Sequence, residues 1–243
     1  MKTMKKNPYP GKFVVLDGLD GSGKATQTKL LVERLKKEDV AVKKIDFPQY
    51  GTKSAGMVEN YLNGKYGDAK EVGPYVSSIF FACDRYDASL RMKDWLEAGH
   101  FLVADRYVSA SIGHQGGKID DNKKRAEFIK WVYSLEFDIF KIPRPDVTFI
   151  LKTSPEIACE MSSKISDSEK VEKRKAYLGK SEKKDIHERD LGHLKDALMA
   201  YTETAGEFPD DFEIIECLKD GRFLPRSVIH EKIWKIIKLR FKL

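Results

Sequence analysis

KFVVLDGLDGSGK, residues 12–24, is the stretch that decides the fold of this chain. An apolar run rich in β-branched residues opens it, and a leucine-rich amphipathic stretch follows it over residues 25–37. Two glycines five residues apart, followed by a lysine and placed between a strand and a helix, form the pattern of a phosphate-binding loop. The stretch therefore predicts a strand, a loop that holds a nucleoside triphosphate, and a helix.

The residue types in this loop suit a bound phosphate. Glycine lets the backbone curl around the anion with no side chain in the way. The curled backbone points its N–H groups at the phosphate, and the start of the helix adds partial positive charge. Lys24 supplies a full charge for the terminal phosphates. A glycine-rich turn that binds nothing is the alternative, and the lysine and the flanking elements argue against it. The expected ATP-binding residues are Gly18, Gly21, Ser22, Gly23, Lys24, Ala25 and Thr26.

Ala25 departs from the motif, which usually has serine or threonine after the lysine to hold Mg²⁺ through its hydroxyl. Thr26 comes one residue later and does not inherit that role automatically. We therefore expect Mg²⁺ to be held mainly by phosphates, by waters and by an acid elsewhere in the chain.

The composition favours a single α/β domain that binds anionic small molecules. The chain has 243 residues, a net charge of +6 and 34% charged residues. Such a charge also suits nucleic acid, but no basic stripe with interleaved aromatics appears. Three cysteines far apart in sequence argue against a disulfide framework and favour the cytoplasm. We expect no signal peptide and no membrane span, because no apolar run is long enough.

Short apolar runs alternate with longer helical stretches, which predicts a mostly parallel sheet covered by helices. The expected strands are residues 13–16, 42–46, 101–104, 147–151 and 213–217. The expected helices are residues 23–37, 54–62, 74–98, 122–135, 155–163, 186–204 and 225–239.

The segment of residues 163–185 carries eight lysines and arginines among acids and few apolar residues. Such a segment is commonly a solvated surface loop. It also suits a lid that closes over phosphates and keeps water away from a transferred group.

Asp105 and Arg106 come directly after an apolar run expected to form a central strand. In open α/β sheets ligands bind at the carboxyl ends of the strands. Asp105 is therefore placed like the acid that faces Mg²⁺ in phosphate-loop enzymes. Arg106 could contact donor and acceptor phosphates together through its planar guanidinium. A structural ion pair at the strand end is the alternative.

Phe81 and Arg85 lie four residues apart on an expected helix and so share a face. Near a nucleotide, the ring can stack on a base and the guanidinium can donate to a base oxygen; a core position is the alternative for the ring. Asp20 lies inside the phosphate loop, where a carboxylate is unfavourable unless it is aimed elsewhere. A sugar hydroxyl of a second substrate is one target, and N–H groups of the loop are the other.

Together these residues resemble the thymidylate kinase family, whose members phosphorylate dTMP to dTDP with ATP. The resemblance spans about residues 12–205, and the combined set of motifs is far more specific than the phosphate loop alone. The matching pieces, in the family's order and spacing, are residues 17–24, 47–48, 81–85, 105–107, 115–116 and 144–146.

The resemblance implies a five-stranded parallel sheet flanked by helices, of the P-loop nucleoside-monophosphate-kinase type with a basic lid. It implies one kinase domain over residues 1–243, with a monophosphate-binding region at about 47–98 and the lid at about 163–186. It further implies ATP, dTMP and Mg²⁺ as ligands, and usually a homodimer.

The resemblance also assigns roles to individual side chains. Lys24 would bind the β- and γ-phosphates, and Arg106 would hold the dTMP phosphate nearby. Asp20 would accept from the 3′-hydroxyl, Phe81 would stack on thymine, and Arg85 would bond its O4. The dTMP-binding residues implied in this way are Asp20, Phe47, Tyr50, Phe81, Arg85, Arg106, Ser111, His114 and Gln115.

Three departures from the family pattern affect these roles. Tyr50 stands where members often place an arginine, so it can hydrogen-bond a phosphate without neutralising it. His114 stands where members often place an aromatic that crowds out a 2′-hydroxyl. Gly21 replaces the loop arginine of some members, and such loops go with a catalytic basic residue in the lid. Arg174 and Arg189 are the candidates for that residue.

Other functions stay open from the sequence. One is a kinase for another nucleoside monophosphate or for a nucleoside. A second is a phosphate-loop ATPase that acts on a protein or nucleic-acid partner. A third is a nucleotide-binding protein with impaired catalysis, which Ala25 and Tyr50 motivate.

Overall fold

The computed structural model describes residues 7–163 and 191–243 of the chain. Five strands form one parallel sheet, as expected, and their order in the sheet is β2-β3-β1-β4-β5. The strands of this sheet are β1 (Lys12–Asp17), β2 (Val42–Asp46), β3 (Phe101–Asp105), β4 (Val147–Lys152) and β5 (Phe212–Glu216). A small antiparallel hairpin pairs β6 (Leu218–Lys219) with β7 (Arg222–Phe223).

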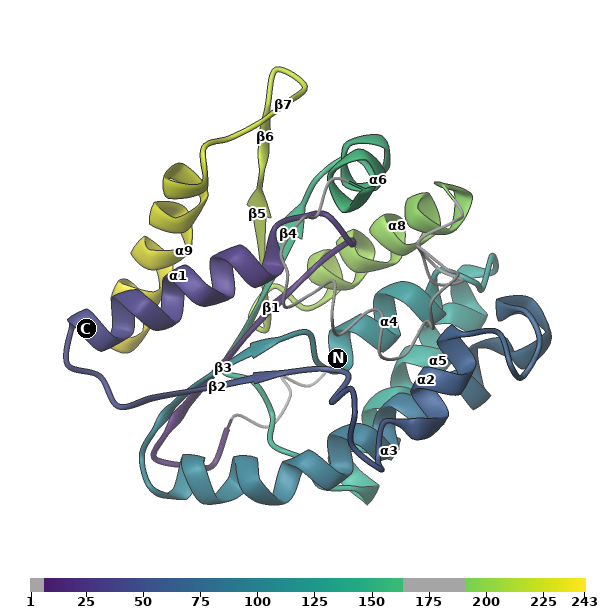
Figure 1. The fold of residues 1–243 in the computed structure, drawn as a ribbon, viewed down its shortest axis with the longest axis horizontal. Coiled ribbons are helices and arrows are strands. Elements are labelled where there is room, and N and C mark those ends of the chain that lie inside the picture. Colours follow the sequence, from purple (N-terminus) through teal and green to yellow (C-terminus); the bar gives the residue numbers. More distant parts are fainter. Residues whose placement is uncertain (1–6, 164–190) are drawn as a thin grey trace.

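Helices cover both faces of the sheet (Figure 1). One layer holds α1 (Lys24–Lys37) and α9 (Arg226–Phe241). The other helices are α2 (Gly56–Leu62), α3 (Ala69–Glu97), α4 (Val108–Gly116), α5 (Asn122–Tyr133), α6 (Pro155–Ser163) and α8 (Leu191–Glu207). A π-helical turn, η1 (Ser134–Ile139), follows α5 directly.

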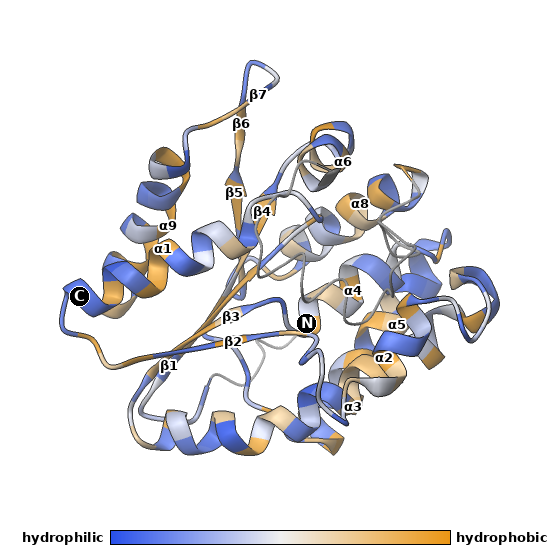
Figure 2. Cartoon of the chain, in the orientation of Figure 1, coloured by the Kyte–Doolittle hydropathy of each residue, from blue (hydrophilic) through white to orange (hydrophobic). Residues whose placement is uncertain are grey.

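Two hydrophobic cores form because neighbouring strand residues point to opposite faces. In β1, Val14 and Leu16 pack against α1 and α9, whereas Phe13 and Val15 pack toward α3, α4, α5 and α8. All four side chains are fully buried. Figure 2 shows hydrophobic residues in the central strands β1 and β4, as expected for strands covered on both sides, whereas the edge strand β2 is mostly hydrophilic.

The strand order brings the ends of β1 and β3 together. Leu16 pairs with Asp105 in the parallel register, and the backbone N–H of Arg106 donates to the Leu16 carbonyl at 2.9 Å. The loop after β1 therefore lies beside the residues that follow β3. This edge of the sheet is where an open α/β fold binds its ligands.

The predicted elements are found with shifts of a few residues at their ends. Residues 42–46 and 155–163 have the predicted bounds, whereas Cys217 lies outside β5. The predicted helix 122–135 is wrong at its end, because the chain widens into η1 after Tyr133. Helix α8 runs on to Glu207, past the predicted residue 204. The predicted lid spans residues 163–186, and all of it after residue 163 lies outside the described residues. The two candidate lid cations, Arg174 and Arg189, also lie outside them.

Helix α4 was not predicted. It is buried along most of its length and contains serine and glycine, so it lacks an amphipathic period that a sequence could show.

Helix α3 carries two of the expected base-contacting residues. Asp68 caps its start, accepting from the backbone N–H groups of Lys70 and Glu71. The backbone breaks at Gly73, which has φ 74°, and Pro74 then opens the long straight part, a position that suits proline. In the described part of the chain, neither α3 nor any other helix is both long and apolar enough to cross a membrane.

Helices α4 and α8 approach each other closely because α4 contains glycines. A Cβ atom on Gly113 would overlap the ring of Tyr201 in α8. A Cβ atom on Gly117, just after α4, would lie 2.8 Å from the backbone nitrogen of Ala197. The seam between the two helices therefore has no room for larger side chains.

Replacing Gly113 with alanine tests this seam. Because the new methyl group must displace the Tyr201 ring, we expect Gly113→Ala to lower the free energy of unfolding by about 1–3 kcal/mol. The matched control is Gly206→Ala in the same helix as Tyr201, where a Cβ meets nothing within 4 Å. That change should raise stability by about 0.5–1 kcal/mol. Urea unfolding measures both, and a Gly113→Ala variant as stable as the parent would contradict the close packing.

Candidate active site

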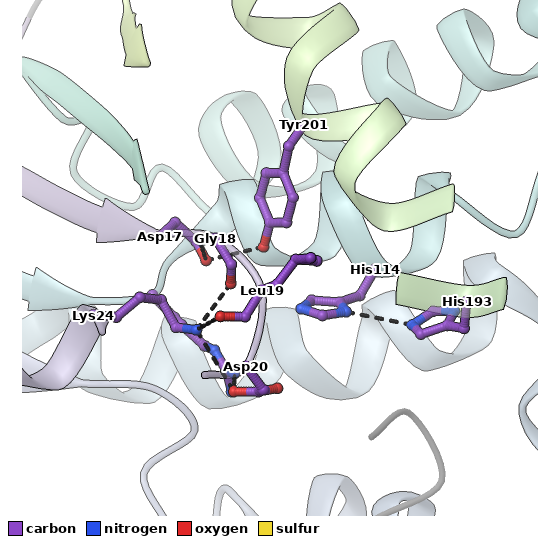
Figure 3. Close-up of polar contacts among 9 residues, drawn as sticks. Asp17, Gly18, Leu19, Asp20, Lys24, His114, His193 and Tyr201 are labelled. Atoms are coloured by element: carbon purple, nitrogen blue, oxygen red, sulfur yellow. Dashed lines mark hydrogen bonds and ion pairs between the residues drawn. The ribbon is translucent and has the colours of Figure 1, made fainter. Parts of the chain in front are cut away.

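Lys24 begins α1 and is buried in the loop that follows β1 (Figure 3). Its ammonium donates to the carbonyl oxygens of Gly18 and Leu19 at 2.9 and 2.7 Å, and lies 3.5 Å from the Asp20 carboxylate. Burial lowers the pKa of Lys24, and the positive charge of Arg106 lowers it further. Oxygen atoms of the loop therefore already hold the Lys24 ammonium, the group that we expect to bind phosphates.

The loop glycines have backbone angles and surroundings that suit glycine alone. Gly18, Gly21 and Gly23 have φ values of 135°, 89° and 91°, which other residues rarely adopt. A Cβ atom on Gly21 would also collide with the carbonyl oxygen of Ala158 in α6. Helix α6 therefore leaves no space for a side chain at position 21.

Asp17, at the end of β1, links three elements beneath the loop. Its carboxylate accepts from the Tyr201 hydroxyl of α8 at 2.9 Å (Figure 3). It also accepts from the Ser109 hydroxyl of α4 at 2.5 Å and from the Gly18 backbone at 2.8 Å. Burial raises the pKa of this fully buried carboxyl. Because every partner is rigidly packed, this network fixes where the loop begins. Tyr201 lies 184 residues from Asp17, so no local sequence signal pointed to it.

Arg106 and Asp20 form an ion pair across the mouth of the loop. Arg106 has φ 68°, a left-handed conformation that is unfavourable for a residue with a side chain and is frequent at functional sites. The ion pair that was the alternative for Arg106 at the strand end is therefore present, and its partner is the loop carboxylate Asp20. Both groups stand where we expect two substrates to meet.

Asp105 ends β3 close enough to Lys24 for its charge to raise the pKa of that lysine, against the dominant effect of burial. Over residues 7–163 and 191–243, three or more histidine, cysteine or carboxylate side chains nowhere gather as a metal site. This donor set fits Mg²⁺ that is held by one protein carboxylate, phosphates and water, and does not fit an all-protein cage.

A pocket opens beside the phosphate loop, and all nine expected dTMP-binding residues line it. Asp20 of the phosphate loop and Arg106, its ion-pair partner after β3, both line this pocket. The pocket also contains three residues that were not expected, Pro48, Leu62 and Ala110. The expected residues in its wall are Asp20, Phe47, Tyr50, Phe81, Arg85, Arg106, Ser111, His114 and Gln115.

Arg85 is buried and held in one orientation by Glu136 of η1. Its Nε and Nη2 donate to the two carboxylate oxygens at 2.7 and 2.6 Å, Nη2 also donates to Ser111 Oγ at 2.7 Å, and Nη1 donates to the Tyr107 carbonyl at 3.3 Å. A guanidinium has five N–H donors, so one donor on Nη1 is left for a ligand. Burial raises the pKa of Glu136, against the stabilising charge of Arg85. Sequence reasoning missed Glu136, which lies 51 residues from Arg85.

His114 lies buried in the pocket wall and stacks on His193 of α8 (Figure 3). The ring centres are 5.5 Å apart, and Nδ1 of His114 lies 3.3 Å from Nε2 of His193. Burial lowers the pKa of His114 well below its usual value, and the neighbouring His193 lowers it further. His114 is therefore neutral near pH 7, which settles the charge that the sequence left open.

The loop with Tyr50 is held by Asp84 of α3. The Asp84 carboxylate accepts from the Gln49 backbone at 2.9 Å and from the Ser54 hydroxyl at 3.0 Å. Phe47 and Pro48, which precede this loop, are joined by a cis peptide bond. Helix α3 thus supplies Phe81 and Arg85 and also positions the loop that carries Tyr50.

A larger cavity of about 500 Å³ lies among residues that start β1, β4 and β5. Lys12, Thr148 and Phe212 are among its lining residues, and no residue of the phosphate loop is. The charged groups converge instead at the loop and at the pocket beside it.

The comparisons with known proteins identify the family of the chain. The family model for thymidylate kinase matches residues 16–190. A thymidylate kinase of Plasmodium falciparum is 33% identical over 173 residues, which are 71% of this chain and 76% of that protein. A thymidylate kinase of an Exiguobacterium species is 28% identical over 223 residues, covering 86% and 91%.

Solved structures show the same architecture. The structure of thymidylate kinase from Candida albicans superposes with a TM-score of 0.67 and covers 95% of this chain and 92% of that one, at 22% identity. That likeness supports the fold, and the extent of the family match supports the membership. The chain belongs to the thymidylate kinase family.

Proposed function

We propose that this protein transfers the γ-phosphoryl group of ATP to dTMP and yields dTDP and ADP, a step in the supply of dTTP. One observation carries the proposal: Asp20 of the phosphate loop forms an ion pair with Arg106, which follows β3, and both residues line the base pocket. A triphosphate in the loop and a monophosphate in the pocket would meet at these two side chains.

The proposed mechanism relies on position and charge. The dTMP phosphate is already an anionic nucleophile, so the reaction needs no strong base. Lys24 would leave its carbonyl partners to bind the β- and γ-phosphates, and Arg106 would hold the two phosphates close together. Lys24 is buried and Arg106 is partly buried, and electrostatic contacts with a transition state are stronger where water is excluded.

Asp105 is the residue that we expect to hold Mg²⁺, since Ala25 has no hydroxyl to offer. The bound ion would neutralise charge that develops on the phosphates. A lid cation, Arg174 or Arg189, stays part of the proposal, because Gly21 has no side chain and no space for one.

Selection of thymine would come from Phe81 and Arg85. Phe81 would stack on the base, and the remaining Nη1 donor of Arg85 would reach O4. Asp20 would accept from the 3′-hydroxyl, and neutral His114 would occupy the space of a 2′-hydroxyl. Tyr50 would hydrogen-bond the phosphate, which leaves neutralisation of its charge to Arg106.

We also propose a homodimer in a reducing compartment such as the cytoplasm. All three cysteines are free. The outer face of α3 leaves large apolar side chains exposed at helical spacing, which suits a second copy of the chain. The residues of this face are Tyr75, Ile79, Tyr86 and Leu90.

Lys24→Met tests the phosphate role. Loss of a single buried charge that contacts the transition state costs about 3–4 kcal/mol, so we expect kcat to fall by two to three orders of magnitude. Lys29→Met, on the exposed side of the same helix, is the matched control and should keep full activity. A coupled assay with ATP, Mg²⁺ and dTMP measures both. A loss of less than tenfold with the fold intact would contradict the role.

The Arg85 role needs a paired variant, because removing Arg85 alone leaves Glu136 as an uncompensated buried charge. Replacing both residues with methionine removes the charges together. We expect the KM for dTMP to rise at least tenfold, since about 1.4 kcal/mol or more of base binding is lost, while the KM for ATP stays within twofold. Equal increases in both KM values would show that Arg85 does not contact the base.

Leu90→Glu tests the α3 face as the dimer surface. Leu90 is 59% exposed, so the change should leave the fold intact but place a charge in the interface. Sedimentation should then report a monomer. Leu239→Glu, at an 82% exposed position on α9, is the control and should stay dimeric. A Leu90→Glu protein with the mass of the parent would exclude this face.

A further inference from the structure

Lys118, directly after α4, reaches into a small hydrophobic cluster around α2. The buried members of this cluster, here called the α2 cluster, are Val58, Tyr61 and Leu62. It is separate from the two main cores. The ammonium of Lys118 donates to the Tyr61 hydroxyl at 2.6 Å and to the Ala69 carbonyl at 3.2 Å. Lys118 does not line the substrate pocket, and the proposed mechanism does not use it.

The partners of this ammonium are unusual for a lysine that is mostly removed from water. Within the described residues, both hydrogen-bond acceptors are neutral oxygens, and no carboxylate forms an ion pair with Lys118. Burying a charge without a counter-charge is unfavourable, so burial lowers the pKa of Lys118 to about 7, while Asp68 opposes that effect. A lysine on the surface would not have this desolvation cost. The cost indicates that the hydrogen bond from Lys118 to Tyr61 has a role in the protein.

The contact joins the two walls of the base pocket. On one wall, the Tyr61 ring meets the Phe81 ring edge-on, with centres 6.1 Å apart and planes at 90°. On the other wall, α4 supplies Ser111, His114 and Gln115. Lys118 follows α4 in sequence and bonds Tyr61, so it connects these walls.

Other contacts leave the α2 side dependent on this bond. Ser77 of α3 donates to Gln115 at 2.8 Å and fixes α3 to α4. Helix α2, by contrast, packs through its small cluster, whose partly buried members include Tyr50 and Phe81. Displacement of Tyr61 would therefore shift the surface against which Phe81 rests.

We infer that Lys118 is a positioning residue for the monophosphate site, acting through Tyr61 to hold Phe81 where it can stack on a pyrimidine base. The inference rests on the proposed function for the identity of the ligand, dTMP. It concerns binding of the monophosphate, and it leaves ATP binding at the loop unaffected.

The ammonium bond should also make dTMP binding depend on pH. A charge-assisted hydrogen bond is roughly twice as strong as a neutral one. With its pKa at about 7, Lys118 carries its charge below that pH and loses it above. The groups that face it are the Tyr61 hydroxyl from α2 and, at the start of α3, the Ala69 carbonyl and the Asp68 carboxylate. Backbone hydrogen bonds lower the pKa of Asp68, so it stays ionised across this range.

Equilibrium binding of dTMP to the full chain tests the inference, with ATP binding as the internal control. Lys118→Met and Tyr61→Phe should each weaken dTMP binding by about fivefold to twentyfold and leave ATP binding within twofold. The double variant should bind dTMP no more weakly than Lys118→Met, because both changes remove one interaction. Lys118→Arg keeps the charged donors and should retain binding within threefold.

A pH series separates positioning from general stability. The dTMP phosphate titrates identically for every variant, so we compare the ratio of parent affinity to Lys118→Met affinity. That ratio should fall by twofold or more between pH 6 and pH 8. A ratio that does not change with pH, equal losses for dTMP and ATP, or additive effects in the double variant would each overturn the inference. So would a lowered melting temperature with unchanged dTMP affinity.

A separate measurement tests the proposed function independently of the role of Lys118. If the parent protein prefers another pyrimidine monophosphate in a panel of dTMP, dUMP, UMP and dCMP, the substrate assignment is wrong. The same variants, measured with the preferred nucleotide, then still decide whether Lys118 positions Phe81.

Discussion

The parallel pairing of β1 with β3 is the constraint on which the site depends. Because Leu16 is in register with Asp105, the loop after β1 and the arginine after β3 emerge side by side. The N–H of Arg106 then completes the pairing on the Leu16 carbonyl, and its left-handed backbone turns the guanidinium toward Asp20. Two segments about 90 residues apart in sequence thus supply one charged centre. If another strand took the place of β3 beside β1, the phosphate loop and Arg106 would lie apart.

Several charged groups of the site are buried, and each is held by several partners. Arg85 has Glu136, Ser111 and a backbone carbonyl; Asp17 has two hydroxyls and a backbone N–H. Such arrangements contribute little net stability, since removing charges from water is costly. They do restrict each side chain to one orientation. Under the proposed function, the pocket would recognise a flat base through the single remaining donor of Arg85 and would need that restriction.

The sequence allowed the fold and most of the pocket to be predicted for identifiable reasons. The strand before the loop is apolar throughout, the loop has a distinctive spacing, and Phe81 and Arg85 share a helical face. The residues and the helix that were missed carry no local sequence pattern. Glu136 sits in a π-helical turn, which no simple periodicity indicates, and Tyr201 reaches Asp17 across most of the chain. Helix α4 has only nine residues, and its two glycines are weak helix formers, so its sequence carries little helical signal.

The contact between Gly21 and α6 bears on how this enzyme can be redesigned. The carbonyl of Ala158 occupies the volume that any larger residue at position 21 would need. An arginine introduced at position 21 would therefore overlap the backbone of α6. A chimera that aims to relocate the catalytic cation must exchange α6 and the loop as one unit. Divergence between the two loop types thus requires coordinated replacement in two segments, and single substitutions are a poor route from one to the other.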